Sequence, residues 1–491
     1  MVRSLTNRQG QMLCMISFVV SRFVYLELLG LSFDESSLID FLQYVDVPLL
    51  KHNLWESLYY LHSQPPGFNL FLGIVLQVFP ESHALVFRTV FLGLGLLFTL
   101  SLFTLMVRLG VSAGISAALT ILFSASPTVV LYESWLYYGY PAAALLCFAA
   151  VLLHRFAVSK ELSVGLAFFS VLTLMAYIWP LFHLIWFAFF CLMILCILRA
   201  HAKNVTLAFC LPLLAVVVLC AKNYVVFGSF STGGDIITSI GLKRTTYYEI
   251  PENEQRSLIK EGKLTQMSLV PRPSIGNVES YIDMIGAPPK TGVAVLDQVR
   301  KFNGESNFNY VGLRKIAKLV SQDNRYFLRM RPDVYLRHVI QNFRQLYFLP
   351  ASDGWMFQDW NFNHPKGSRP AGIQRLDRLY NLMLLGQRWP SAPAYFLVVG
   401  FPVLLAFGFY AGAKAIGGKD VATFITLFFV VANILYVTLA IMVFGEEDFN
   451  RYRFTIDAFY LTLLGLLISS VSPGVKAIWL KRNAQYTLHA E

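Results

Sequence analysis

The stretch Phe33–Asn69 reads FDESSLIDFLQYVDVPLLKHNLWESLYYLHSQPPGFN. It begins where a long apolar segment, 11–31, ends, and it leads into a shorter apolar run, 68–79. Asp34 and Glu35 stand at its start, where the low-dielectric interior of a membrane raises the energy of a negative charge. An acidic pair in this position indicates that at least one of the two carboxylates has a functional use.

At the other end of this stretch, His62 and Gln64 precede the Pro-Pro dipeptide 65–66. Proline fixes its own backbone and restricts the residue before it, so this element predicts a rigid turn back into the apolar run. Both ends of residues 33–66 are then held at the membrane surface. We therefore predict that this loop carries the active site, and that a juxtamembrane helix follows over 67–80.

The composition is typical of a polytopic membrane protein. Hydrophobic residues make up 56% of the 491 residues and charged residues only 14%, and the mean hydropathy is +0.55. These values exclude a soluble multidomain protein. All six cysteines fall inside apolar segments, so no disulfide framework is predicted. The first apolar segment has no small-residue cleavage site, and we interpret it as a retained transmembrane helix.

The apolar runs predict about 10 transmembrane helices. A span needs roughly 20 residues. The run 68–79 is shorter and is therefore not counted. With the N-terminus in the cytoplasm, the Lys and Arg residues of the short loops fall on the cytoplasmic side, as the positive-inside rule requires. The predicted spans are 11–31, 85–107, 111–127, 140–158, 162–178, 182–199, 205–226, 392–413, 421–443 and 455–472.

This topology divides the chain into three parts. Residues 1–226 form an N-terminal transmembrane module, 227–391 a polar domain on the non-cytoplasmic side, and 392–491 the C-terminal transmembrane helices. From 222 to 390 the sequence has 23 Lys and Arg against 14 Asp and Glu, which accounts for most of the net charge of +11. Within the polar domain, Pro332 predicts the start of an amphipathic helix.

Two more polar features fall on the non-cytoplasmic face. Glu133 is the only charged residue in the predicted loop 127–140, where a solvated side chain is the simpler alternative. Arg451 and Arg453 stand at the start of the last span, and the planar guanidinium suits a phosphate. Tyr138 belongs to the aromatic residues of this face, most of which we interpret as interfacial and some as stacking on sugar rings.

Several alternatives stay open. Asp34 has an equally good interpretation as the cap of a short helix, because Asp favours that position. His62 has the residue type of a metal ligand, but a lone histidine is more often a hydrogen-bonding partner. The sequence contains no Walker loop, no GxGxxG after a strand, no HExxH and no CxxC pair, so it does not support nucleotide chemistry, a zinc protease or a thiol redox site.

Together these features resemble the GT-C superfamily of integral membrane glycosyltransferases, which includes protein O-mannosyltransferases and lipid A aminoarabinose transferases. Asp34-Glu35 resembles the acidic motif of the first loop, residues 62–66 resemble the Pro-Pro element, and Glu133 resembles the acid of the second loop. Segments 222–228 and 447–454 are similar to patterns in uncharacterised bacterial members.

The resemblance implies a GT-C-like fold and sugar transfer from a polyprenyl-phosphate-linked donor on the non-cytoplasmic face. A glycan, lipid or protein would be the acceptor, and no nucleic acid is a partner. A carboxylate would act as general base while cations stabilise the departing phosphate. Some family members need a divalent metal and others do not, so no metal ligand is assigned. We expect a bacterial inner membrane rather than the endoplasmic reticulum.

The resemblance also implies roles for individual residues. Asp34 is the expected general base, and Glu35 and Glu133 are expected to orient the acceptor or the sugar. The expected substrate-binding residues are His62, Gln64, Tyr138, Arg451 and Arg453, of which the two arginines would hold the phosphate.

A lipid-carrier flippase, another transporter or a polysaccharide polymerase is the competing class. Such a protein would also need cations near a lipid phosphate and a basic external domain. A transporter, however, is expected to have polar or broken helices at mid-membrane, often in two similar halves. The charged residues gather at one face and the two halves differ, which favours the enzyme.

The topology can be tested by labelling. In a cysteine-free background, Arg300→Cys is expected to react with a membrane-impermeant thiol reagent added to intact cells, because 227–391 is predicted to face outward. Labelling that requires permeabilised cells would reverse the predicted orientation.

Overall fold

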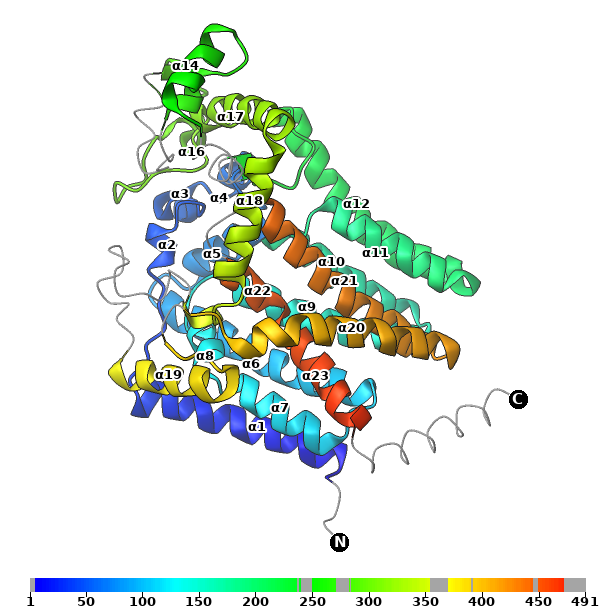
Figure 1. Cartoon of the computed structure of the whole chain (residues 1–491). Helices are drawn as coiled ribbons and strands as arrows, with labels where there is room; N and C mark the ends of the chain where they lie inside the picture. Colours follow the sequence, from blue (N-terminus) through cyan, green and yellow to red (C-terminus); the bar gives the residue numbers. More distant parts are fainter. Residues whose placement is uncertain are drawn as a thin grey trace.

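The structure is a computed structural model that describes residues 5–471 except 236–237, 240–249, 271–281, 283, 354–369, 390–391 and 445–448. The described part of the chain is helical, and its β-pairing is confined to two isolated bridges. Figure 1 shows long helices that run side by side and shorter helices gathered at one end of them. The predicted class, a helical polytopic membrane protein, is confirmed.

By length and composition, seven helical segments of the described chain can cross a membrane. They are Asn7–Leu28 (α1, Asn7–Phe23, and a π-helical turn), α6 (His83–Arg108), α9 (Gly139–Ser159), Arg199–Phe227 (mainly α12, Ala202–Phe227), α20 (Tyr395–Gly417), α21 (Val421–Phe444) and Phe449–Val471 (α22, Phe449–Arg453, and α23, Asp457–Val471).

The predicted count of about ten spans is not confirmed. An eighth span results if α7 (Ala113–Ser124) and α8 (Pro127–Glu133), which are bent by 60° at their junction, are counted as one. The two predicted spans 162–178 and 182–199 correspond to α10 (Leu162–Ile178) and α11 (Leu184–Ile197), which have only 17 and 14 residues and are not among the seven. The run after the Pro-Pro turn forms α5 (Gly67–Val78), a helix of 12 residues.

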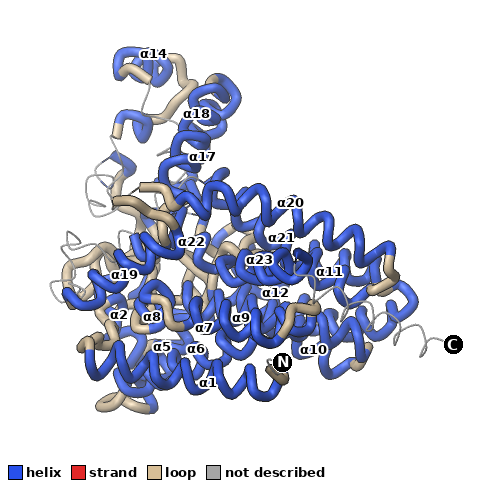
Figure 2. Tube along the Cα trace, turned by 60° about the horizontal axis from the view of Figure 1, so that its bottom comes forward, coloured by secondary structure: helices blue, strands red, loops and turns tan. Residues whose placement is uncertain are grey.

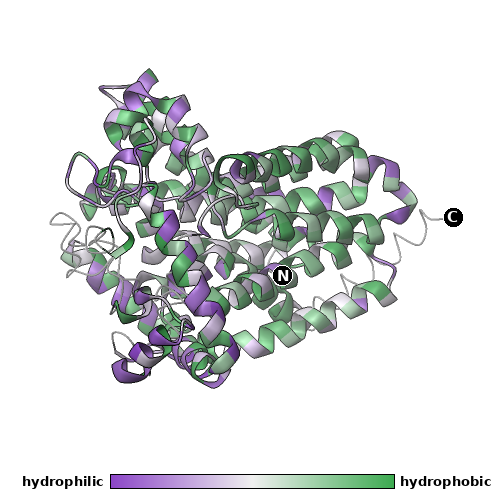
Figure 3. Cartoon of the chain, turned by 90° about the horizontal axis from the view of Figure 1, so that it is seen from above, coloured by the Kyte–Doolittle hydropathy of each residue, from purple (hydrophilic) through white to green (hydrophobic). Residues whose placement is uncertain are grey.

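The shorter polar helices lie at one end of the long ones. Figure 3 shows hydrophilic residues concentrated there, whereas the long helices are largely hydrophobic. The helix predicted from Pro332 forms and begins at that residue. These helices are α2 (Ser37–Asp40), α3 (Val47–His52), α4 (Leu54–Tyr59), α14 (Glu252–Lys260), α16 (Ala294–Asp297), α17 (Gly312–Met330), α18 (Pro332–Asn342) and α19 (Ala371–Leu385).

The main core is centred on α9, which packs against α6, α10 and α21 (Figure 2). Its sequence contains two runs of alanine, Ala142–Ala144 and Ala149–Ala150, and all five residues are buried. Without a strong hydrophobic force between helices in a lipid environment, small residues favour association because they let backbones approach closely. The alanine-rich sequence of α9 therefore explains its central position.

A segment of the polar region holds the 33–66 loop from outside. The backbone N–H of Phe308 donates to the carbonyl of Leu42 (3.2 Å), and Lys301 Nζ donates to the carbonyl of Phe41 (2.6 Å). Asp46 Oδ2 accepts from the backbone N–H of Phe302 (3.0 Å). Burial lowers the pKa of Lys301 to about 8. The loop is thus fixed between the membrane helices and residues more than 200 positions later in the chain.

Candidate functional site

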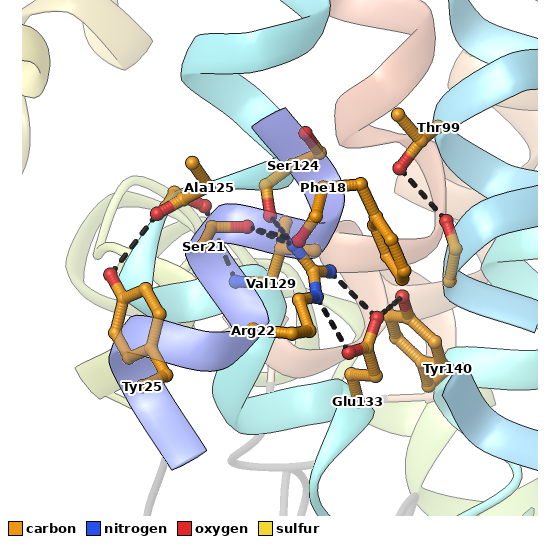
Figure 4. Close-up of polar contacts among 12 residues, drawn as sticks. Phe18, Ser21, Arg22, Tyr25, Thr99, Ser124, Ala125, Val129, Glu133 and Tyr140 are labelled. Carbon is orange, nitrogen blue, oxygen red and sulfur yellow. Dashed lines mark hydrogen bonds and ion pairs between the residues drawn. The ribbon is translucent and has the colours of Figure 1, made fainter. Parts of the chain in front are cut away.

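The break between α7 and α8 positions the second loop of the site. Pro127 cannot continue α7, because its ring clashes with the carbonyl four residues earlier. The N–H of Val129 then donates to Ser126 Oγ (3.3 Å) instead of to the carbonyl of Ala125, so carbonyls at the end of α7 lose their intrahelical partners. Two side chains of the first span replace those partners. Arg22 Nη1 donates to the carbonyl of Ser124 (2.6 Å), and the Tyr25 hydroxyl donates to the carbonyl of Ala125 (3.0 Å), as Figure 4 shows.

Arg22 also binds Glu133, the last residue of α8. Its Nε and Nη2 donate to Glu133 Oε1 (2.8 Å) and Oε2 (2.7 Å), and the Tyr140 hydroxyl donates to Oε2 (2.7 Å) (Figure 4). Both charged side chains are buried. Gly95 is needed beside them, because a Cβ at that position would overlap the carboxylate. Glu133 is therefore not a solvated loop residue, and residues 127–133 of the predicted loop are helical.

The segment directly after Glu133 pairs with the first loop. Asp34 N–H donates to the carbonyl of Ser134 (2.7 Å), and Leu136 N–H donates to the carbonyl of Asp34 (2.8 Å). Asp34 Oδ1 accepts from the backbone N–H of Ser36 (2.9 Å), an Asx turn at the start of α2. The structure thus brings the two acidic loops together through their backbones, and the carboxylate of Asp34 takes part in the turn.

Glu35 points toward a different neighbour. Its Oε2 lies 3.7 Å from Nε2 of His83, the first residue of α6, and both side chains are partly exposed. The structure therefore places the two carboxylates of the acidic pair beside different groups.

Arg451 lies against the aromatic residues of the second loop. The rings of Trp135 and Tyr137 stack with their centroids 4.1 Å apart. Arg451 Nη1 donates to the Tyr137 hydroxyl, and its guanidinium carbon lies 5.0 Å from the ring centroids of both Tyr137 and Tyr452. Tyr138, the next residue, donates from its hydroxyl to Gln43 Oε1 (3.2 Å). Arg451 and the second loop therefore share one aromatic layer.

Arg453 is turned into the protein. Its Nε donates to Asp457 Oδ1 (3.1 Å) and its Nη1 donates to the carbonyl of Tyr347 (2.7 Å), and the side chain is buried. The acidic residues 446–448, which the sequence places beside the two arginines, lie outside the described residues. The structure thus gives Arg453 internal partners and places only Arg451 against the aromatic layer.

A cavity of about 420 Å³ adjoins this layer, and we call it the aromatic cavity. Its lining combines polar and aromatic side chains with apolar side chains of α11 and α21. Of the residues predicted for the site, only Tyr138 lines it. The first group includes Gln43, Tyr138, Trp179, Gly233, Gly234, Asp235, Thr238 and Tyr452, and the apolar group includes Leu184, Ile185, Ala440, Ile441 and Phe444.

The Gly-Gly pair of this cavity lies directly over the His62–Gln64 segment. Gly234 N–H donates to the carbonyl of His62 (3.1 Å). Gly233 has a φ of +125°, and a Cβ on it would lie 2.9 Å from the carbonyl carbon of Gln64. Glycine is required here because no side chain fits and the backbone is left-handed. The signal in the sequence is a Gly-Gly pair soon after the predicted span 205–226, and it was not among the residues predicted for the site.

His62 and Gln64 are themselves buried. His62 Nε2 lies 3.0 Å from the carbonyl of Asn309, and burial lowers the pKa of the imidazole to about 3, so it is neutral at pH 7. Neither polar atom of the Gln64 side chain has a hydrogen-bond partner among the described residues. The backbone of His62 and Gln64 lies against Gly233 and Gly234, which line the aromatic cavity.

The 222–228 segment is hydrogen-bonded to the surrounding loops. Lys222 Nζ donates to the carbonyl of Tyr59 (2.9 Å), and Asn223 Nδ2 donates to the carbonyl of Ser231 (2.7 Å). No group of three or more His, Cys, Asp or Glu side chains suited to a metal ion occurs in the part of the chain that the structure describes.

No protein-family model matches the chain, and no curated protein matches it. Two solved structures from Archaeoglobus fulgidus are similar to it. One is the archaeal oligosaccharyltransferase AglB in complex with an inhibitory peptide and a dolichol-phosphate (11% identity, TM-score 0.38, covering 97% of this chain and 52% of that one). The other is the oligosaccharyltransferase in the apo form (10% identity, TM-score 0.41, covering 98% and 52%). The chain spans about half the length of these two proteins.

The Arg22–Glu133 pair generates a stability prediction. Arg22→Met is expected to lower the free energy of unfolding by roughly 3–5 kcal/mol, because it leaves a buried carboxylate without its cation. Thermal unfolding of the purified protein in detergent measures the change.

The double variant Arg22→Met/Glu133→Met is the matched control. It removes both charges and is expected to be more stable than Arg22→Met alone. A double variant that is less stable than the single one would contradict the role of the pair.

Proposed function

We propose that the chain is a glycosyltransferase that moves a sugar from a polyprenyl-phosphate-linked donor to an acceptor on the non-cytoplasmic membrane face. The observation that supports this most directly is the division of the lining of the aromatic cavity into aromatic and polar side chains on the one hand and apolar side chains of α11 and α21 on the other. A donor that joins a sugar to a long isoprenoid chain has the same division.

The isoprenoid, the sugar and the phosphate of the donor can each be assigned to different residues in or beside the cavity. Ile441 and Phe444 of α21 offer an apolar surface to the isoprenoid. The rings of Trp179 and Tyr452, with centroids 5.2 Å apart, offer faces on which a sugar ring can stack. Arg451 lies against Tyr452 and supplies a fixed positive charge for the phosphate that leaves.

The reaction requires a base. The acceptor hydroxyl gives its proton to a carboxylate, and its oxygen attacks the anomeric carbon. The bond from that carbon to the phosphate oxygen then breaks, and the polyprenyl phosphate leaves with the electron pair. We assign the base to Asp34, whose backbone pairs with the second loop. Glu133 positions Asp34 indirectly. Its ion pair with Arg22 fixes where residues 134–136 begin, and these residues form the backbone hydrogen bonds with Asp34.

Asp235 is the second candidate for the base. It lines the aromatic cavity, which Asp34 does not, and its Oδ2 accepts from the hydroxyl of Ser229. The two carboxylates can be distinguished by substitution.

A flippase or another transporter is the alternative function. The bent pair α7 and α8 is the kind of broken span that transporters use. In such proteins, however, the free backbone groups of the break line a substrate cavity. Here the carbonyls of Ser124 and Ala125 accept from Arg22 and Tyr25, so the break is closed within the protein. This contact favours the enzyme.

Asp34→Asn tests the base. Asn retains the shape and can still accept the hydrogen bond of the Asx turn, so folding is expected to be normal. Turnover is expected to fall by roughly two to four orders of magnitude, because the proton acceptor is gone. The measurement is transfer of radiolabelled sugar from a polyprenyl-phosphate donor to a crude membrane acceptor.

Glu35→Gln, Glu133→Gln and Asp235→Asn are the comparison variants. Glu35→Gln is expected to have the smallest effect, and Glu133→Gln is expected to lower stability as well as activity. Normal turnover by Asp34→Asn together with an inactive Asp235→Asn would assign the base to Asp235. Full activity in all four would contradict a carboxylate base in this region.

The two arginines are expected to respond differently. Arg451→Ala should raise the KM for the donor with little change in protein abundance, and Arg451→Lys should restore donor binding only in part, because the planar fork is lost. Arg453→Ala should lower thermal stability, because it leaves Asp457 without its partner. Unchanged donor kinetics in Arg451→Ala would remove the phosphate assignment.

A further inference from the structure

A second hollow, of about 980 Å³, lies beside the aromatic cavity between the end of α12 and the helix α17. We call it the basic groove. Asp235 and Thr238 line both hollows, so the two are neighbours across that segment. The groove is lined by His62, Phe227, Gly228, Ser229, Asp235, Thr238, Ser239, Arg314, Lys315, Ala317, Lys318, Ser321 and Arg325.

The charge of the groove comes from one face of α17. Arg314, Lys318, Ser321 and Arg325 recur at intervals of four, three and four residues, which places them in one stripe along the helix. With Lys315 the lining has four cationic side chains, against one carboxylate. Such a stripe has two ordinary explanations, a solvated helix face or a site for an anion, and a second observation is needed to decide between them.

His62 supplies that observation. It lines the groove, and its side chain is only 4% exposed. Its Nε2 faces the carbonyl of Asn309, so Nε2 carries the proton and Nδ1 is an acceptor. Nδ1 has no hydrogen-bond partner among the described residues. A buried acceptor without a partner is costly, and such a group is not expected beneath an ordinary solvated helix face.

The groove also has hydroxyl groups of its own. Ser229 and Thr238 line it from the segment that follows α12. Ser239 and Ser321 also line it, and their hydroxyl groups are hydrogen-bonded to each other (2.7 Å). A ligand that fits this lining carries an oxyanion for the lysines and arginines and hydroxyl groups for the neutral side chains. A phosphorylated or carboxylated sugar has both.

We propose that the basic groove binds the anionic group of the acceptor, and that the acceptor is therefore a carbohydrate that bears a phosphate or a carboxylate. The anion site itself does not depend on the proposed function, whereas the identification of its ligand as the acceptor rests on that function. The donor's phosphate is assigned to Arg451, at the aromatic layer, and the groove lies on the other side of the Asp235 segment. The acceptor would reach the aromatic cavity past Asp235 and Thr238.

The test measures binding separately from transfer. The full chain in phosphatidylcholine nanodiscs is titrated with glucose 6-phosphate and, as the uncharged comparison, with glucose. Lys318→Gln/Arg325→Gln removes two cations from the groove without touching the residues assigned to catalysis. The double variant is expected to weaken glucose 6-phosphate binding by at least about tenfold, the effect of losing a charge-assisted hydrogen bond.

Lys260→Gln/Arg329→Gln is the matched control. It removes the same charge from exposed positions, one of them on α17, that do not line the groove. This control is expected to bind glucose 6-phosphate as the unmodified chain does. Equal weakening in both double variants would show a general charge effect and overturn the proposal, and so would binding of glucose as tight as that of its phosphate.

A further experiment distinguishes a sugar phosphate from a lipid headgroup as the ligand of the basic groove. The titration is repeated in nanodiscs that contain phosphatidylglycerol. If the groove takes a lipid phosphate, these nanodiscs abolish glucose 6-phosphate binding, and the acceptor assignment is overturned. Retained binding supports it. Retained binding in a chain that shows no sugar transfer from any polyprenyl-phosphate donor would leave the anion site in place and contradict only the proposed function.

Discussion

The bidentate pair between Arg22 and Glu133 is the interaction on which the candidate site depends. It joins the first span to the end of a broken span, and both charged side chains are almost fully buried. Each ion alone would be strongly unfavourable there, and together they are tolerated because every strong donor and acceptor has a partner. The geometry of the second loop follows from this pair, because the chain leaves α8 immediately after Glu133.

A buried ion pair is weak evidence for stability, because two apolar side chains often serve as well. Here the pair fixes the direction in which the chain leaves α8. Arg22 closes the carbonyl left free by the helix break and holds the carboxylate that ends the next helix. Residues 134–136 then meet Asp34 in register through two backbone hydrogen bonds. An apolar pair could fill the same space but could not satisfy the carbonyl of Ser124 or define one rotation of α8.

Two hollows of the described chain, the aromatic cavity and the basic groove, differ in chemistry. The aromatic cavity is lined by polar and aromatic side chains and by apolar side chains of α11 and α21, and the basic groove has cations, hydroxyl groups and one buried imidazole. The segment around Asp235 separates them. Its Gly-Gly pair allows the backbone to lie directly on the His62–Gln64 segment, which is why both hollows adjoin the same loop. This arrangement places two different ligand chemistries side by side at the polar end of the membrane helices.

The sequence by itself determined the class of the protein, because apolar runs of span length have no stable alternative to membrane helices. It also placed the short helix after Pro66 and the helix start at Pro332, since proline acts locally. Only the tertiary structure decided the partners. Arg22 and Glu133 are 111 residues apart, and His62 and Asn309 are 247 apart, so no local pattern could pair them. The tertiary structure also decided the partners of Arg451 and Arg453, which are only two residues apart. Their guanidinium groups contact different neighbours, because positions two apart on a helix face different directions.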